Sequence, residues 1–178
     1  MSRLYTVDPA LANGQAAQLF TAIKEAVGMV PNAFVAIGSN SPVALKAALD
    51  LDSALRKSSL SSVQVEAIKL AVSAHAGCDY CVAAHTAIGG HAGLSHATMR
   101  SLRASGASGD PSIDALVNFA TRVATTTGTV PADDVAAVKA AGYTDAQVVD
   151  TLLAVASITF TNLVNRVNDT VIDFPAVN

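Results

Sequence analysis

Apolar residues recur at intervals of three and four through most of this 178-residue chain, in segments that Gly, Pro and polar caps separate. This periodicity is typical of amphipathic helices, whereas half-buried strands alternate with a period of two. No credible pair of such strands is present. The stretch 148–171 is rich in β-branched residues and by propensity alone also suits a strand, but its length without a turn signal favours a helix. The sequence therefore predicts an all-α helical bundle.

Local signals give the expected helix ends. Two capping boxes, S-x-x-Q at 61–64 and T-x-x-Q at 144–147, mark helix starts. Gly77 should interrupt the chain between two helices, and Gly89-Gly90 should end the second of them. Residues 28–32 are expected to form a break. The predicted helices span 9–27, 42–57, 61–76, 78–88, 95–103, 113–125, 131–140 and 144–171.

The length suits one compact domain, or two small helical halves that share a core. We therefore predict a single all-α domain over residues 1–178, with its motif region at about 60–90. Segment 61–85 can be laid over 144–168 without a gap, which suggests a degenerate repeat at about 143–170. Because Ala/Val-rich helices match one another by chance, both interpretations of this match stay open.

Composition and charge narrow the expected partners. The net charge is −3 and the basic residues are scattered, which argues against a nucleic-acid partner. The N-terminus lacks the apolar core of a secretory signal, and the longest nearly apolar run, 152–158, is far shorter than the ~20 residues of a membrane span. We expect a cytoplasmic protein with no membrane partner. Because only 14% of residues are charged, a homo-oligomer is expected, with an Ala-rich monomer as the alternative.

The two cysteines, Cys78 and Cys81, form a single C-x-x-C motif, and His85 follows four residues later. On a helix these three positions share one face. Thiols placed in this way can close a disulfide, bind a metal, or act as a nucleophile with a base at hand. In the cytoplasm such a pair is more typical of redox or metal chemistry than of a structural crosslink.

Glu66 joins this set through a length argument. If the chain reverses near Gly77, Glu66 lies about 16 Å back along one helix and His85 about 12 Å along the next, at about 1.5 Å per residue. In an antiparallel pair these depths nearly coincide. The carboxylate can then orient the imidazole and stabilise its charged form, and His85 lies where a general base for the Cys81 thiol is needed.

Glu66, Cys78, Cys81 and His85 together resemble the E-x11-C-x-x-C-x3-H signature of the alkylhydroperoxidase D (AhpD)-like family, within the carboxymuconolactone decarboxylase superfamily. The resemblance covers roughly residues 60–90. It implies an all-α, often trimeric peroxidase that reduces organic hydroperoxides. Cys81 would be the peroxidatic cysteine and Cys78 the resolving one, with Glu66 and His85 as a proton relay.

The resemblance also implies that a dithiol or a thiol protein regenerates the enzyme, and that no metal, flavin or nicotinamide cofactor is needed. One position departs from the family pattern. The best-studied type has a second histidine between the cysteines, where this chain has Tyr80. A tyrosine donates a hydrogen bond but does not act as a base near neutral pH, so the departure bears on efficiency or on the choice of reductant.

Three alternative functions remain open at this point. The thiol pair can serve a redox sensor or a disulfide oxidoreductase. A decarboxylase-like superfamily enzyme can act on a small acid or lactone by proton transfer alone. A zinc site can be assembled from Cys78, Cys81 and His85 with either His75 or Glu66.

The remaining polar residues of interest carry weaker signals. His91 and His96 are expected to be structural or exposed. Asn165, Arg166 and Asn168 interrupt the apolar last helix, where they can line a pocket or bond across a subunit interface. Satisfied burial in the core is the simpler expectation.

Overall fold

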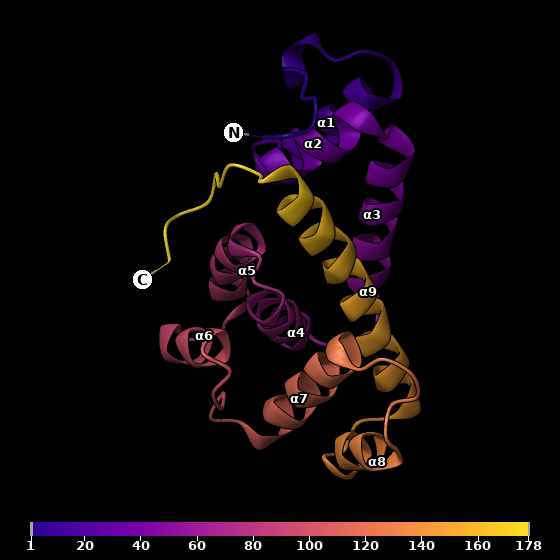
Figure 1. Cartoon of the computed structure of the whole chain (residues 1–178), viewed down its shortest axis with the longest axis vertical. Coiled ribbons are helices and arrows are strands. Elements are labelled where there is room, and N and C mark those ends of the chain that lie inside the picture. Colours follow the sequence, from indigo (N-terminus) through magenta and orange to yellow (C-terminus); the bar gives the residue numbers. More distant parts are fainter. Residues whose placement is uncertain (1, 178) are drawn as a thin grey trace.

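The computed structural model describes residues 2–177, and within them the chain is all-α, with no strand. This confirms the predicted fold class. A 3-10 turn, η1 (Pro9–Leu11), precedes the helices α1 (Gly14–Val27), α2 (Asn32–Asn40), α3 (Pro42–Leu55), α4 (Ser62–His75), α5 (Asp79–Ala92), α6 (His96–Arg103), α7 (Pro111–Thr125), α8 (Ala132–Ala140) and α9 (Asp145–Asn168). In Figure 1, α1–α3 lie at one end of the molecule and α7–α8 at the other, with α9 running between them.

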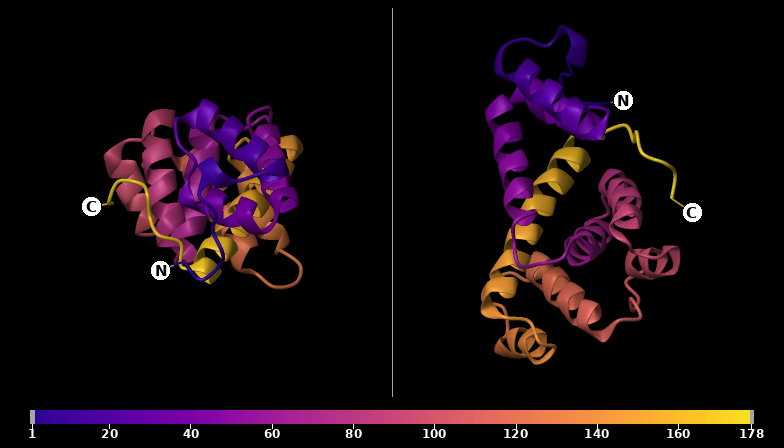
Figure 2. Two further views of the ribbon diagram at one scale, coloured as in Figure 1. Left: turned by 90° about the horizontal axis from the view of Figure 1, so that it is seen from above. Right: turned by 180° about the vertical axis from the view of Figure 1, so that it is seen from behind.

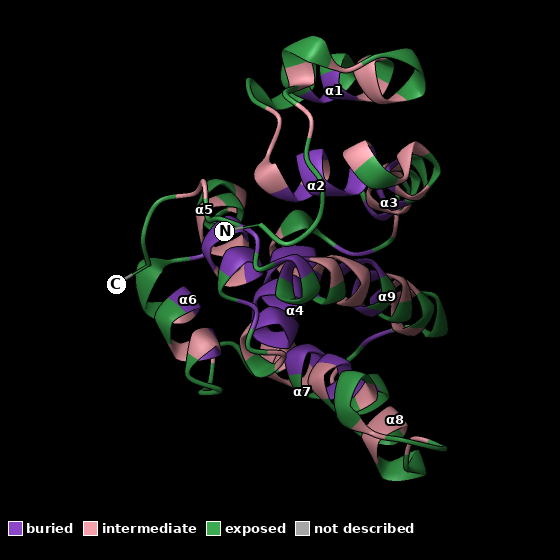
Figure 3. Cartoon of the chain, turned by 45° about the horizontal axis from the view of Figure 1, so that its top comes forward, coloured by how far each residue is buried: buried purple, intermediate pink, exposed green. Residues whose placement is uncertain are grey.

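Helix α4 is the centre of the molecule. It contacts α5, α6, α7 and α9, and every residue from Val65 to Ser73 is buried (Figure 3). A helix that is buried on all sides must find partners for its polar side chains inside the protein. Glu66, Lys69 and Ser73 are the buried polar residues of α4. Each has a partner on a different neighbouring helix, and one of these partners is His85.

Gly77 reverses the chain between α4 and α5. Its φ of +64° lies in the left-handed region, which a glycine adopts without the steric penalty that a Cβ brings. The Cys78 N–H donates to the Ser73 carbonyl across the turn at 3.1 Å, and α4 and α5 then pack side by side. The predicted reversal is therefore present. Both predicted capping boxes are also present, at the starts of α4 and α9.

Helix α9 is the one helix in the described part of the chain that is long and apolar enough to cross a membrane by length and composition. A single such helix is weak evidence for a span, because a core helix passes the same test. Here 33% of the apolar window is buried in the protein. Its buried face carries hydroxyl and amide side chains that bond to α3 and α4, among them Ser157 to Asp52 and Asn162 to Ser73. These are the contacts of a core helix.

Helix α2 is an addition to the predicted helices, which left 33–41 unassigned. It is short and ends at a polar residue before Pro42, so its local signal is weak. Packing explains it, because a Cβ at Gly38 would lie 2.5 Å from Phe20 Cε1 of α1 and 2.7 Å from Leu45 Cδ2 of α3. Close contact with two neighbouring helices therefore stabilises α2 more than its own sequence does.

The predicted helix end at Gly89-Gly90 is wrong. Helix α5 continues through both glycines to Ala92, and Gly93 at φ +110° terminates it. A Cβ at position 89 would lie 3.0 Å from Leu94 Cδ1 and 3.4 Å from Met99 Sδ. Gly89 is thus a site of close packing inside the helix rather than a helix stop.

The two ends of the chain lie on the same side of the molecule, as the views in Figure 2 agree. The N-terminal segment is held to the end of α9, where the Leu4 N–H donates to Asn168 Oδ1 at 2.8 Å. The segments aligned as a repeat differ in shape, because 61–85 folds as two helices and 144–168 as one. The repeat stays a prediction.

Candidate active site

Glu66 and His85 form a buried pair between α4 and α5. Glu66 Oε2 lies 2.7 Å from His85 Nδ1, and the two side chains are 11% and 12% exposed. This is the contact that the antiparallel arrangement predicted. A carboxylate on Nδ1 fixes the ring orientation and leaves Nε2 as the nitrogen that exchanges a proton. His85 lies one turn after Cys81 on α5, on the same helix face.

The two cysteines lie at the start of α5. Cys78 is the N-cap residue, Cys81 lies in the first turn, and both are free thiols, 2% and 3% exposed. A hydrogen bond from the Cys81 thiol lowers the pKa of Cys78, although burial opposes this. The same bond, together with burial, raises the pKa of Cys81. The two thiols are therefore hydrogen-bonded neighbours, which is an arrangement from which a disulfide can form.

Helix α9 supplies polar groups to the Cys81 sulfur. Asn165 Nδ2 donates to Cys81 Sγ at 3.3 Å. The Asn165 contact lowers the pKa of Cys81, and so does the nearby Thr161 hydroxyl, one turn earlier on α9, but both are outweighed by the larger raising effects. The sequence singled out Asn165 only as a polar residue in an apolar helix. Its contact with the nucleophile candidate brings together positions that are 84 residues apart.

The hydroxyl of Tyr80, the residue between the two cysteines in the sequence, is hydrogen-bonded to groups outside the thiol pair. Its hydroxyl donates to Asp173 Oδ1 at 2.7 Å and accepts from the Ala33 N–H at 3.1 Å. Its ring meets Phe174 edge-on, with centroids 5.6 Å apart. Burial and the neighbouring Asp173 carboxylate raise the pKa of this phenol. Tyr80 therefore attaches the C-terminal segment and α2 to the start of α5.

A second buried pair lies one turn further along α4. Lys69 Nζ is 2.7 Å from Asp52 Oδ1 of α3, and Ser157 Oγ of α9 donates to the same oxygen at 2.9 Å. Burial alone would raise the pKa of Asp52, but the charge and hydrogen bond of Lys69, helped by Ser157, hold it below its ordinary value of 3.8. This pair was not predicted, because α3 and α4 are not joined by a tight reversal such as the one at Gly77, so spacing along the chain does not bring Asp52 to Lys69.

The predicted polar residues at the end of α9 have different environments. Asn168 is fully buried and satisfied, since it also donates to Thr170 Oγ1 at 2.9 Å. Arg166 is exposed, its carbonyl accepts from Arg3 Nη1 at 3.4 Å, and its positive charge helps to lower the pKa of Cys78. Asn165 alone of the three reaches the cysteines.

The other histidines, His75, His91 and His96, are all exposed. Among residues 2–177, no three His, Cys, Asp or Glu side chains are grouped so as to hold a metal ion. His85 is instead turned to Glu66, and Cys81 to Asn165. The zinc ligand set considered from the sequence is therefore not assembled in the described residues.

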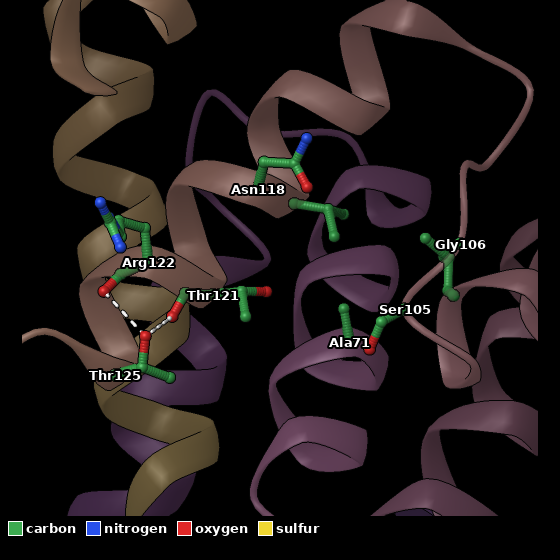
Figure 4. A pocket seen from close by; sticks show the side chains of 9 residues that line it. Ala71, Ser105, Gly106, Asn118, Thr121, Arg122 and Thr125 are labelled. Carbon is green, nitrogen blue, oxygen red and sulfur yellow. Dashed lines mark hydrogen bonds between the residues drawn. The ribbon is translucent and has the colours of Figure 1, made fainter. Parts of the chain in front are cut away.

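A shallow cavity of about 270 Å³ lies elsewhere, between α4, α6 and α7 (Figure 4). Its polar lining includes Asn118, Thr121 and Arg122. Arg122 is paired with Asp134 at 3.0 Å, and Thr125 bonds back to its own helix. No cysteine or histidine lines this cavity, so it is separate from the thiol chemistry.

The family model for carboxymuconolactone decarboxylases matches residues 42–122, from the start of α3 into α7. This segment contains Glu66, both cysteines and His85 in the geometry described above. The likeness to the carboxymuconolactone decarboxylase family therefore covers a little under half of the chain, including all four motif residues. A comparison with curated proteins found no match.

Solved structures extend the likeness to nearly the whole length of the chain. An uncharacterized peroxidase-related protein with an alkylhydroperoxidase AhpD core, from Ralstonia eutropha JMP134, is 24% identical with a TM-score of 0.87, over 97% of this chain and 92% of its own. A peroxidase-related protein from Silicibacter sp. TM1040 is 20% identical with a TM-score of 0.78, over 96% and 94%. The debrominase Bmp8 is 17% identical with a TM-score of 0.77, over 97% and 93%. These likenesses show an AhpD-like fold.

Helix α9 lies outside the segment that the family model matches. The motif residues are therefore joined by a side chain that the motif does not contain, Asn165. The signal that could have found it is the placement of amides and hydroxyls at helical spacing on one face of an apolar helix. That signal predicts that such a side chain is buried, but it does not predict which residue the side chain contacts.

Proposed function

We propose that this protein reduces organic hydroperoxides through a dithiol–disulfide cycle of Cys78 and Cys81. The observation that carries the proposal is the 2.7 Å contact between Glu66 and His85, one helical turn from Cys81. Buried carboxylate–imidazole pairs next to a thiol remove its proton and return a proton to the leaving group. The AhpD-like fold and the family likeness agree with this chemistry.

The first step uses Cys81 as the nucleophile. His85, oriented by Glu66, takes the thiol proton, and the thiolate attacks the terminal oxygen of the hydroperoxide. An S–O bond forms and the O–O bond breaks. The departing alkoxide takes the proton from His85 and leaves as an alcohol, and Cys81 is left as a sulfenic acid.

The second step uses Cys78. Its sulfur attacks the sulfenic sulfur, a disulfide forms, and the sulfenic oxygen leaves as water with the Cys78 proton. A small dithiol or a thiol protein then reduces the disulfide by thiol–disulfide exchange and is itself oxidised. Such a cycle requires a pool of reduced thiols, for which we propose the cytoplasm as the compartment.

We also propose that the protein forms a homo-oligomer. Large apolar residues of α9 remain exposed in the single chain, among them Val149 at 63%, Leu163 at 52% and Val167 at 60%. Apolar surface that gathers along one helix is typical of a subunit contact. Light scattering at several concentrations tests this, and a monomer at all of them would contradict it.

Steady-state turnover tests the proposed reaction. Wild-type protein, Cys78→Ser and Cys81→Ser are assayed with cumene hydroperoxide and dithiothreitol, and alcohol release is measured. We expect steady turnover by the wild type and none by Cys81→Ser; Cys78→Ser without dithiothreitol should release one equivalent of alcohol and stop at the sulfenic acid. Equal alcohol release by the wild type and Cys81→Ser would exclude the mechanism.

Disulfide exchange without a peroxide is the second candidate. The specific observation that favours it is the place of Cys78 at the N-cap of α5, with the Cys81 thiol bonded to it; this bond lowers the pKa of Cys78 and makes it the better attacking thiolate. An oxidoreductase of this type forms its mixed disulfide at Cys78. Trapping of a disulfide substrate on Cys81→Ser, together with inertness of the wild type toward hydroperoxides, would favour this function over the first.

A further inference from the structure

In the amide group of Asn165, the nitrogen is hydrogen-bonded and the oxygen is not. Its Nδ2 donates to Cys81 Sγ at 3.3 Å, and the residue is 4% exposed. Its Oδ1 is the one buried side-chain oxygen or nitrogen in the described part of the chain that has no hydrogen-bond partner. A buried acceptor without a donor costs free energy, so native proteins rarely retain one without a use.

The neighbouring amides of α9 show that the unpaired oxygen is particular to the position at the sulfur. Asn162, one turn before Asn165, accepts from Ser73 Oγ at 3.1 Å. Asn168, one turn after it, accepts from the Leu4 N–H at 2.8 Å. All three amides are buried on the same helix. Only the residue that contacts Cys81 has an acceptor to spare.

We propose that Asn165 is a catalytic residue that selects Cys81 as the reacting sulfur and binds the oxygen atom that this sulfur acquires. This inference rests on the proposed function. Nδ2 stabilises the Cys81 thiolate, because an N–H donates more strongly to a charged sulfur than to a neutral thiol. Oδ1 accepts the O–H of the terminal hydroperoxide oxygen.

The same hydrogen bond can persist through the reaction. When the thiolate attacks the terminal oxygen, the S–O bond forms, the O–O bond breaks, and the alkoxide leaves with the proton held by His85. The terminal oxygen keeps its own hydrogen and becomes the O–H of the sulfenic acid. An acceptor placed beside Sγ is therefore satisfied by the bound hydroperoxide and by the sulfenic acid alike.

The role of Nδ2 follows from its contact with Cys81 Sγ and from the hydrogen bond between the two cysteines. The thiol of Cys81 donates to Cys78, which favours a thiolate at Cys78 and a neutral Cys81. The donor from α9 opposes this and favours the other placement of the proton, with the charge on Cys81. Without Asn165, the sulfur next to the Glu66–His85 pair would lose a charge-stabilising donor while its competitor kept one.

The test uses Cys78→Ser protein, in which Cys81 is the single thiol, with Asn165→Ala or Asn162→Ala added as a matched pair. Two rates are measured between pH 5 and 10: alkylation of Cys81 by iodoacetamide, and sulfenic acid formation with cumene hydroperoxide. For Asn165→Ala we expect an alkylation profile displaced to higher pH and a hydroperoxide rate lowered about tenfold to hundredfold at pH 7, the range for a lost hydrogen bond to a charged group. Asn162→Ala should change neither.

Asn165→Asp serves as the second variant, because it keeps the size of the side chain and removes both N–H donors. It should displace the alkylation profile further, since it adds a negative charge beside the thiolate. An unchanged profile in both Asn165 variants would overturn the inference, and so would equal slowing by Asn162→Ala. If alkylation depends on Asn165 while no variant reacts with hydroperoxide, the proposed function fails and only the role of Nδ2 is supported.

Discussion

Two polar pairs lie one turn apart on α4, and they differ in the type of partner side chain and in their distance along the fold from the cysteines. Glu66 meets His85 of α5, and Lys69 meets Asp52 of α3, each at 2.7 Å. An imidazole is the type of side chain that exchanges a proton near neutral pH, whereas an ammonium paired with a carboxylate keeps its proton there. Only the first pair lies beside the cysteines. The strength of a buried pair therefore does not mark it as functional; the titrating group and the nearby thiols do.

Lys69→Met, which removes the cation of the second pair, should have the largest effect on stability. This change leaves the Asp52 carboxylate largely buried without its cation, and we expect a loss of about 2–3 kcal/mol in the free energy of unfolding, at the low end because Asp52 is partly solvated. Urea unfolding measures it. The rate of disulfide formation per folded molecule should stay within twofold of wild type, and a large loss of that rate would contradict the structural role of this pair.

Glu66→Gln breaks the other pair. The amide keeps the size of the side chain but cannot stabilise a charged imidazole, so the rate of Cys81 oxidation by cumene hydroperoxide should fall about tenfold to hundredfold. Stopped-flow measurement under single-turnover conditions gives this rate. Its unfolding free energy should change less than that of Lys69→Met. A variant that loses stability without losing rate would reverse the assignment of the two pairs.

Tyr80→Phe tests whether Tyr80 belongs to the reacting site. It removes the hydrogen bonds to Asp173 and to the Ala33 N–H, for which we expect a loss of about 1–2 kcal/mol in unfolding free energy. Because the hydroxyl does not exchange protons with the cysteines in this arrangement, the hydroperoxide rate should stay near that of wild type. A rate loss larger than the one from Glu66→Gln would show that Tyr80 takes part in the chemistry.

Acid should abolish the stabilising effect of the Lys69–Asp52 pair. The folded state holds the pKa of Asp52 below 3.8, so its stabilisation is complete above the unfolded pKa and disappears as pH falls through the lower folded value. Burial without the cation raises the pKa of Asp52 in Lys69→Met, so the difference in unfolding free energy between wild type and this variant should be largest near pH 7 and shrink by about 1 kcal/mol or more as the pH falls below about 4. A difference that grows on acidification would contradict the assignment.

The sequence predicts well where local signals act. The capping boxes begin α4 and α9 as expected, and Gly77 reverses the chain where a left-handed residue is needed. Helix α2 and the continuation of α5 through Gly89 were missed, because packing against other helices determines both. A short helix has little signal of its own, and a glycine stops or continues a helix according to its neighbours.

The same division holds at the site. Spacing along two helices was enough to bring Glu66 to His85. The contacts of Asn165 with Cys81 and of Asp52 with Lys69 join helices that no tight reversal connects. Their register depends on how α3, α4, α5 and α9 pack together, which no short stretch of sequence encodes.

The most direct test of the central claim is a thiol count by alkylation and mass spectrometry, before and after one equivalent of cumene hydroperoxide. The account predicts rapid loss of both thiols from the wild type, a Cys78–Cys81 disulfide in their place, and no disulfide in Cys81→Ser. Two thiols that survive unchanged in folded wild-type protein would contradict it.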